Sequence, residues 1–419
     1  MKKLLLYYSK HPSQMIFAGM LLGLLTGLFA PQAGMQLSII GELFLRALKL
    51  LIVPVIVVSM LVGVLNLEDS TSLGRLGVKA LVYYASTTAI AVLIGLLMVN
   101  IIKPGIRHQT EQQSRLVQST SKPQKEPART SLQEVVKKII PENIIFAAEE
   151  GNVLGLIFFS VFLGIALLSV KHEAVEIIKT SLAAVFDSII WMVDKVMLFA
   201  APGVFSLVAK VVAEFSLKSD LGQLGEALGS YALTVISGLL LHAIVALPLL
   251  AVYFKINPAK LFYYMFPALS TAFSTASSAA TLPLTLECLR ERAKIPDRIA
   301  GFVAPLGATV NMDGTAIYEA VAAVFIANFY GIALSFPEQF VVFLTATFSA
   351  VGAAGIPGAG LIMMTMVLDS VGIPAEGIAL IVAIDRPLDM LRTSINVWGD
   401  SIGAAVVAKS EGETIFAVG

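Results

Sequence analysis

Long apolar runs follow one another along the chain and are separated by short polar segments. Several of them approach the roughly 20 residues that an α-helix needs to cross a bilayer. The pattern predicts membrane-spanning helices at about 13–31, 37–66, 77–102, 183–214 and 224–254. Between the third and fourth of these spans, the chain re-enters the membrane over about 139–170, with a break near residues 149–151.

The longest polar segment covers residues 103–140. It is rich in Gln, Ser, Lys and Pro and has no apolar periodicity. Such a segment cannot bury a core, so we expect a flexible loop. Lys2, Lys3 and Lys10 precede the first span and place the N-terminus in the cytoplasm, because basic residues favour that side. Three spans then place the loop outside the cell.

Two apolar segments in the C-terminal half are interrupted by small and hydroxyl residues. The first contains STASSAATLP (274–283) and the second contains GAAGIPGAG (352–360). Irregular backbone at membrane depth is tolerated only where protein covers it or where it lines a cavity. The interruptions favour two re-entrant hairpins around a site near the membrane midplane. One kinked spanning helix in each place is the alternative.

The composition agrees with a membrane protein. Hydrophobic residues make up 57% of the 419 residues and charged residues only 14%, against about 25% charged in soluble domains. A net charge of zero gives no electrostatic reason to expect a nucleic-acid partner. The single cysteine excludes an internal disulfide, and the four histidines lack metal-ligand spacing. The sequence predicts an all-α polytopic protein of the lipid bilayer, without an organic cofactor.

The stretch IDRPLDMLRTSINVWGD (384–400) concentrates charge inside an apolar region. At 100° per residue, its polar side chains share a sector about 120° wide. They are Asp385, Arg386, Asp389, Arg392, Thr393, Asn396 and Asp400. Each charge at the bilayer centre costs at least roughly 2.5–3.5 kcal/mol, so this stripe must face a partner, a ligand or water.

Two interpretations of the stripe stay open. A self-neutralising ladder of Asp389 with Arg386 or Arg392 would explain one pair of charges. It does not explain Asp400, which has no cation within one helical turn. A lone carboxylate suits a hard cation such as Na⁺.

Two further motifs carry oxygen-rich or donor-rich groups. In GATVNMDGTAIYEA (307–320), Asn311 and Asp313 lie at a break in an apolar span. The freed carbonyl oxygens and these side chains could together hold a cation. In STASSAATLP, exposed N–H groups and hydroxyls suit a carboxylate ligand. Such small-residue runs are also common at helix contacts.

Together these motifs resemble those of the glutamate/neutral amino-acid transporter family, which includes excitatory amino-acid transporters, archaeal aspartate transporters and bacterial dicarboxylate carriers. NMDGT, SS-x-x-TLP, GAAGIPGAG and D-x-x-R-T-x-x-N-x-x-GD carry the resemblance, which covers the chain apart from the 103–135 loop. It implies eight transmembrane helices, two re-entrant hairpins and inverted repeats, as in the archaeal member. It also implies a homotrimer in the plasma (inner) membrane, elevator-type movement and both termini in the cytoplasm.

The resemblance further implies a static scaffold and a moving transport domain. The scaffold comprises helices 1–2 (1–76) and helices 4–5 (141–215). The transport domain comprises helix 3 (77–102), helix 6 (216–254) and a core at 255–419. Within this core the expected elements are hairpin 1 (about 258–292), helix 7 (about 297–329), hairpin 2 (about 335–370) and helix 8 (about 374–409). The second hairpin would be the gate.

An acidic amino acid, aspartate or glutamate, is the implied substrate. Asp389 matches the residue that binds its amino group, and Arg392 matches the residue that pairs with its side-chain carboxylate. Relatives for neutral amino acids lack this arginine. The implied substrate-binding residues are Ser277, Ser278, Thr315, Ile356, Gly360, Asp389, Arg392, Thr393 and Asn396. A Na⁺- or H⁺-coupled C4-dicarboxylate carrier is the alternative, but its substrate would have no use for Asp389.

Coupling to Na⁺ is implied through two or three sites. One site matches Gly307, Asn311, Asn396 and Asp400, and a second matches Tyr84, Thr87, Thr88, Asn311 and Asp313. A third matches backbone around Thr309, Met312, Ala350, Val351 and Ala353. Glu319 matches a glutamate associated with proton cotransport, which leaves H⁺ coupling as an open addition.

The family's second arginine is absent from its usual places, which are Ala276 and Met390 here. Arg386 lies on the same helical face and is the candidate replacement. From other functional classes, an ion channel would conduct without concentrating a substrate. An intramembrane enzyme is disfavoured because the chain has no recognisable Ser/His pair and no G-x-S-x-G motif.

Overall fold

The computed structural model describes residues 12–65, 71–105, 139–149, 152–170, 174–217, 221–352 and 359–416, with the single residues 137 and 172. Every regular element within these ranges is helical, which confirms the all-α prediction. In the first half of the chain the helices are α2 (Pro12–Phe29), α3 (Pro31–Gln36), α4 (Ser38–Leu65), α5 (Thr71–Ile102), α8 (Ile144–Glu149), α9 (Val153–Ser169), α10 (Ala174–Met197) and α11 (Ala200–Leu217).

The second half begins with α12 (Leu221–Leu241), the π-helical turn η2 (His242–Ala246) and α13 (Leu247–Tyr253), which continue one another. The remaining elements are α14 (Pro258–Thr275), α15 (Ser278–Glu287), η3 (Cys288–Arg292), α16 (Asp297–Val310), α17 (Asp313–Phe329), α18 (Phe336–Gly352), α19 (Ala359–Ser370), η4 (Ala375–Gly377) and α20 (Ile378–Ser410). Most of the loop expected at 103–140 lies outside the described residues.

Within the described ranges, five helical stretches are long and apolar enough to cross a membrane. They are Pro31–Leu65, Arg75–Ile102, Ala200–Leu217, Leu221–Tyr253 and Asp297–Phe329. Two shorter apolar helices cover Gln14–Phe29 and Gly155–Ser169. This pattern fits a polytopic membrane protein, while the expected number of eight spans stays a prediction.

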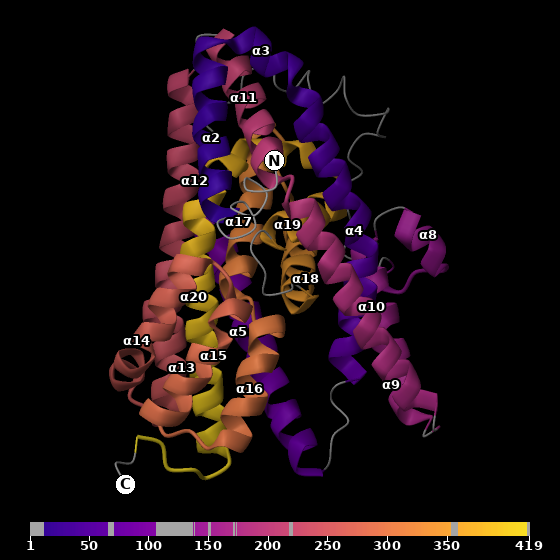
Figure 1. The fold of residues 1–419 in the computed structure, drawn as a ribbon, viewed down its shortest axis with the longest axis vertical. Helices are drawn as coiled ribbons and strands as arrows, with labels where there is room; N and C mark the ends of the chain where they lie inside the picture. Colours follow the sequence, from indigo (N-terminus) through magenta and orange to yellow (C-terminus); the bar gives the residue numbers. More distant parts are fainter. Residues whose placement is uncertain are drawn as a thin grey trace, which may run out of the picture.

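A stripe of glycines joins α2 to α11. Gly19, Gly23 and Gly27 recur every fourth residue and therefore share one face of α2. A Cβ atom at Gly19 or Gly23 would lie only 2.5 Å from the carbonyl oxygen of Ala201 or Phe205, respectively. Small residues at such spacing let helix backbones approach closely within a membrane. The stripe explains why these two helices run side by side in Figure 1.

Helix α20 runs through the middle of the molecule to the end where the C-terminus lies (Figure 1). It packs against α5, α11, α12, α14, α15, α16 and α17. Nearly all of α17 is buried as well. The helix with the most charge thus lies among protein neighbours rather than on the outer surface, as its charged stripe requires.

Two pairs of helices form the expected hairpins. Helices α14 and α15 pack against each other, as do α18 and α19. Ala276 adopts a left-handed conformation (φ 50°) between α14 and α15, and the Ser277 Oγ atom then caps α15 by accepting a hydrogen bond from the Ala280 N–H (3.2 Å). One kinked spanning helix would not fold back on itself in this way.

The structure differs from the single span predicted at 183–214. Helix α10 ends at Met197 and α11 begins at Ala200. Pro202 lies in the first turn of α11, where its missing N–H is tolerated. In a continuous helix its ring would clash with the carbonyl group of Leu198, so the proline favours two separate helices.

Candidate functional site

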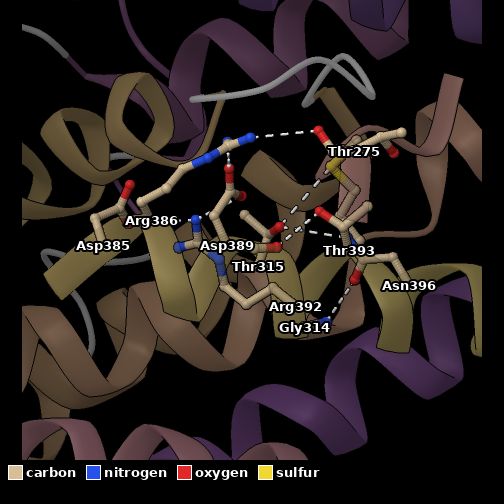
Figure 2. Close-up of polar contacts among 10 residues, drawn as sticks. Thr275, Gly314, Thr315, Asp385, Arg386, Asp389, Arg392, Thr393 and Asn396 are labelled. Atoms are coloured by element: carbon tan, nitrogen blue, oxygen red, sulfur yellow. Dashed lines mark hydrogen bonds and ion pairs between the residues drawn. The ribbon is translucent and has the colours of Figure 1, made fainter. Parts of the chain in front are cut away.

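The charged stripe of α20 forms a ladder of ion pairs (Figure 2). The Arg386 Nη1 atom donates to one carboxylate oxygen of Asp389 (2.9 Å), and the Arg392 Nη2 atom donates to the other (2.8 Å). Arg392 Nη2 also lies 3.3 Å from Asp385 Oδ1. Four buried charges thus neutralise one another in pairs, and Asp389 is held between two cations.

Arg392 is 1% exposed and is held by contacts on several sides. Its guanidinium group lies 3.7 Å from the ring centroid of Tyr318, a cation–π contact. A Cβ atom at Gly360 would lie 3.1 Å from Nη1, so only glycine lets the backbone of α19 approach so closely. Among the described residues, no group accepts a hydrogen bond from its Nε or Nη1 atom. These buried donors fit a carboxylate ligand.

Arg386 links α20 to the first hairpin. Its Nη2 atom donates to the carbonyl oxygen of Thr275 (3.3 Å), at the end of α14 (Figure 2). The last carbonyl groups of a helix lack partners within the helix. Arg386 therefore connects Asp389 with the hairpin tip, next to Ala276, where the sequence lacks the family's expected arginine.

Thr315, Thr393 and Asn396 lie close to this ladder (Figure 2). The Thr393 hydroxyl donates to the carbonyl oxygen of Asp389 (2.8 Å). The Asn396 Oδ1 atom accepts from the Gly314 N–H (2.8 Å), and its Nδ2 atom lies 3.5 Å from the Thr315 hydroxyl. Ser277 and Ser278 are buried at the tip of hairpin 1. Ile356 lies outside the described residues.

A second polar cluster lies at the break between α16 and α17. The Asn311 Nδ2 atom donates to Asp400 Oδ1 (2.9 Å), and Thr87 Oγ1 lies 3.4 Å from Asn311 Oδ1. The Thr88 hydroxyl donates to Asp313 Oδ1 (2.8 Å). Groups from α5, α16, α17 and α20 thus converge in a buried site.

Gly307 lets this cluster close. A Cβ atom there would lie 2.4 Å from Asp400 Oδ1 and 2.5 Å from the Tyr84 hydroxyl, which donates to the Val303 carbonyl oxygen (2.8 Å). The described residues contain no group of three His, Cys, Asp or Glu side chains that could hold a metal ion. Hydroxyl, amide and carboxylate oxygens instead fit a hard cation. In a transporter such an ion would be a substrate.

Only part of the third expected cation site falls within the described residues. Thr309 is exposed, and its hydroxyl donates to the Leu306 carbonyl oxygen (3.0 Å). Met312 and Ala350 are buried. Ala353 and the side chain of Val351 lie outside the described residues.

The sequence reasoning missed His242. This residue is fully buried in η2, and its Nε2 atom lies 2.9 Å from Asp313 Oδ2. The sequence did offer a signal, because His242 is the one Asp, Glu, Lys, Arg or His residue between Glu226 and Lys255. An ionisable residue inside a span implies a functional role and a partner. Helical spacing could not identify this partner, because Asp313 lies 71 residues further along the chain.

Glu319 is also fully buried. The Ser349 hydroxyl donates to one of its carboxylate oxygens, and no described residue bonds to the other. This arrangement joins α17 to α18 of the second hairpin.

A small pocket of about 20 Å³ lies beside the ladder. Asp385, Arg386 and Asp389 line it from α20, and Leu361 lines it from α19. Apolar residues of α2, α10 and α11 form its other wall: Ile16, Met197, Ala200 and Val204. The charged ladder is therefore the polar wall of a cavity.

Comparison with known proteins identifies the family. Residues 13–410 match the model of the sodium:dicarboxylate symporter family. The chain belongs to this family. The match spans almost the whole chain, and it confirms the resemblance inferred from the motifs.

Curated relatives of this symporter are excitatory amino acid transporters. Excitatory amino acid transporter 1 of Ambystoma tigrinum is 38% identical over 88% of this chain and 76% of the relative. Excitatory amino acid transporter 3 of Mus musculus is 36% identical over 88% and 78%. Excitatory amino acid transporter 2 of Homo sapiens is 38% identical over 92% and 75%. A transporter, rather than an enzyme, is the class that these matches support.

We predict that Gly307→Ala selectively weakens Na⁺ binding, because the new methyl group would force Asp400 and Tyr84 apart. The measurement is the Na⁺ concentration needed to raise the melting temperature of the purified protein. Gly301→Ala is the matched control, because on the same helix a Cβ atom would meet only side-chain ends at 3.2 Å or more. Equal Na⁺ responses of the two variants would contradict the prediction.

Proposed function

We propose that this symporter moves an acidic amino acid, aspartate or glutamate, across the membrane together with Na⁺. The observation that carries the proposal is the buried Arg392, whose Nε and Nη1 atoms donate to no described residue and which lies beside the carboxylate of Asp389. An acidic amino acid offers the matching groups, a side-chain carboxylate for the arginine and an ammonium group for the aspartate. The names of the curated relatives support the same substrate class.

In this mechanism the substrate rearranges the ladder. Its side-chain carboxylate binds Arg392, and its amino group becomes a partner of Asp389. Thr315 and Thr393 add hydroxyl contacts, Asn396 lies near the α-carboxylate, and Ser277 and Ser278 line the site from hairpin 1. Arg386 keeps its hydrogen bond to the Thr275 carbonyl oxygen at the tip of that hairpin. Ile356 and Gly360 complete the binding site from hairpin 2.

Na⁺ binds at the cluster around Asn311, Asp313 and Asp400, with Thr87, Thr88 and Tyr84 supplying hydroxyl groups. The support is the convergence of uncharged oxygens on two carboxylates that form no ion pair with Arg or Lys among the described residues. A hard cation stabilises such carboxylates. Asn396 lies one turn before Asp400 and connects the cation site with the substrate site.

We also propose that the protein is a homotrimer whose helices α5 and α12–α20 move as a transport domain against the other helices, with the second hairpin as the gate. Both termini lie in the cytoplasm. Basic residues at the end of the molecule that carries the C-terminus support this orientation. They include Arg290, Arg292, Lys294, Arg298 and Lys409.

A C4-dicarboxylate carrier is less well supported. Such a substrate would satisfy Arg392 but would place a second carboxylate near Asp389, where like charges repel. The ion pairs of Asp389 with Arg386 and Arg392 lessen this repulsion. The distinction therefore needs a direct comparison of substrates.

Purified protein in liposomes should accumulate labelled aspartate or glutamate when an inward Na⁺ gradient is imposed, and succinate should compete weakly. Vesicles with equal Na⁺ on both sides are the control. Equal uptake with and without the Na⁺ gradient would refute Na⁺ coupling. Greater uptake of succinate than of aspartate would favour the dicarboxylate carrier.

Arg392→Ala should strongly weaken binding of acidic substrates, because their side-chain carboxylate would lose its partner in a buried site. Loss of a charged hydrogen bond costs about 1.5–3 kcal/mol, which corresponds to a weakening of about tenfold or more. Competition with labelled aspartate measures the effect. Serine, which lacks the second carboxylate, is the control ligand, and retained glutamate affinity would show that Arg392 has another role.

Glu319→Gln should remove any stimulation of uptake by an inward pH gradient, because an amide cannot carry a proton. A buried carboxyl group is least costly to move through the membrane when it is protonated. The measurement compares uptake with and without the gradient in both proteins. The same response in the wild-type protein and the variant would eliminate Glu319 as the proton carrier.

A further inference from the structure

The C-terminal segment 411–416 lies against the end of the molecule at which α20 ends, and it contacts three other helices. Glu411 binds Arg75 and Lys79 of α5. Glu413 pairs with Arg298 of α16. Phe416 packs beside Tyr264 and Lys260 of α14, and its N–H donates to the Ala293 carbonyl oxygen (2.9 Å). We call residues 411–416 the C-terminal strap.

The contact between Glu411 and α5 is the most extensively bonded part of the strap. Arg75 donates through Nε to Oε1 (3.1 Å) and through Nη2 to Oε2 (2.6 Å). Such two-point pairing fixes geometry as well as distance. Lys79 Nζ lies 2.5 Å from Glu411 Oε1 and 3.0 Å from the Ser410 carbonyl oxygen, so it also binds the end of α20.

These bonds set the register of two antiparallel helices. The start of α5 meets the end of α20, and further along α5 the Tyr83 hydroxyl donates to the Gly399 carbonyl oxygen (3.1 Å). A Cβ atom at Gly403 would lie 2.8 Å from the Tyr83 ring, so the helices are in close contact there too. The helices therefore cannot slide past one another without breaking the Glu411 contacts.

The cation cluster depends on that register. Thr87 and Thr88 reach it from α5, and Asp400 reaches it from α20. Lys79 lies about 14 Å along the helix axis from Thr88, and Glu411 lies about 17 Å from Asp400, at 1.5 Å per residue. A helix is stiff over such distances, so a displacement of its end moves the residues at the cation cluster by a similar amount. Cation ligands are sensitive to displacements of a fraction of an ångström.

We infer that Glu411 is a positioning residue for Na⁺ binding: by fastening the end of α20 to Arg75 and Lys79, it aligns the α5 hydroxyls with Asn311, Asp313 and Asp400. The inference rests on the proposed Na⁺ coupling. Hydrogen bonds from Lys79 and Arg75 also lower the pKa of Glu411. The Glu411 carboxylate consequently stays ionised near neutral pH. Its ion pairs with Arg75 and Lys79 are lost only as the pH falls through that lowered pKa.

The test compares Glu411→Gln with the wild-type protein in liposomes. The variant should raise the Na⁺ concentration for half-maximal uptake by about threefold to tenfold, less than the loss of a direct partner of a metal ligand. The maximal rate and the order of substrate preference should stay the same. Glu411→Asp should recover much of the Na⁺ affinity, since it restores the charge.

Glu291→Gln is the matched control, because it removes the same charge at the same end of the molecule from η3, which packs mainly against α14, α15 and α16. Arg75→Gln is the second variant. Its side chain is 63% exposed, so it tests the same contact if Glu411→Gln fails to fold. Its effect should not add to that of Glu411→Gln, because both remove one interaction.

The outcomes separate the two proposals. Uptake by the wild-type protein that is independent of Na⁺ would refute the proposed function itself. Na⁺-dependent uptake with an unchanged half-maximal Na⁺ concentration in both Glu411→Gln and Arg75→Gln would overturn only the positioning role. A lower melting temperature or maximal rate with unchanged Na⁺ affinity would likewise overturn it, since the strap would then be merely structural.

Discussion

The burial of charge on α20 is the constraint on which the rest of the structure depends. Asp385, Arg386, Asp389, Arg392 and Asp400 all lie on one helix, and all are at most 8% exposed. At membrane depth such groups are tolerated only with partners or water. The packing of many other helices around α20 keeps the stripe away from lipid. The ion-pair ladder then neutralises four of its five charges.

The fifth charge supports the proposed cation site. Asp400 bonds to an amide, and Asp313 bonds to a hydroxyl and an imidazole, so neither has an Arg or Lys partner among the described residues. An acidic amino acid brings a further net negative charge to a ladder that is already neutral. Binding it without a cation would therefore add uncompensated charge to a buried site. On this electrostatic argument, Na⁺ and substrate favour each other's binding, which is the physical basis of symport.

Much of this arrangement was predictable from the sequence, because helical spacing places residues on a face. Helical spacing identified the α20 stripe, and interruptions of apolar segments by small and polar residues identified the break at Asn311 and both hairpins. Neither signal identified contacts between distant helices. The Arg386 contact with Thr275 joins residues 111 positions apart, and that of Glu411 with Arg75 joins residues 336 apart. Spacing within one helix carries no information about such partners, and for the same reason the role of His242 was missed.

The two hairpins are held to α20 by different interactions, and this difference favours the second as the gate. At the tip of hairpin 1, Arg386 donates a charged hydrogen bond to the Thr275 carbonyl, and Ser277 caps the following helix. At Gly360 of hairpin 2, the backbone only approaches the Arg392 guanidinium, whose remaining donors bond to no described residue. Opening hairpin 1 must therefore break a hydrogen bond to a buried cation, whereas the described residues of α19 meet Arg392 through packing at Gly360, without a hydrogen bond. A substrate carboxylate bound to Arg392 would lie beneath Gly360 and replace these packing contacts. Substrate binding would therefore directly affect whether this hairpin closes.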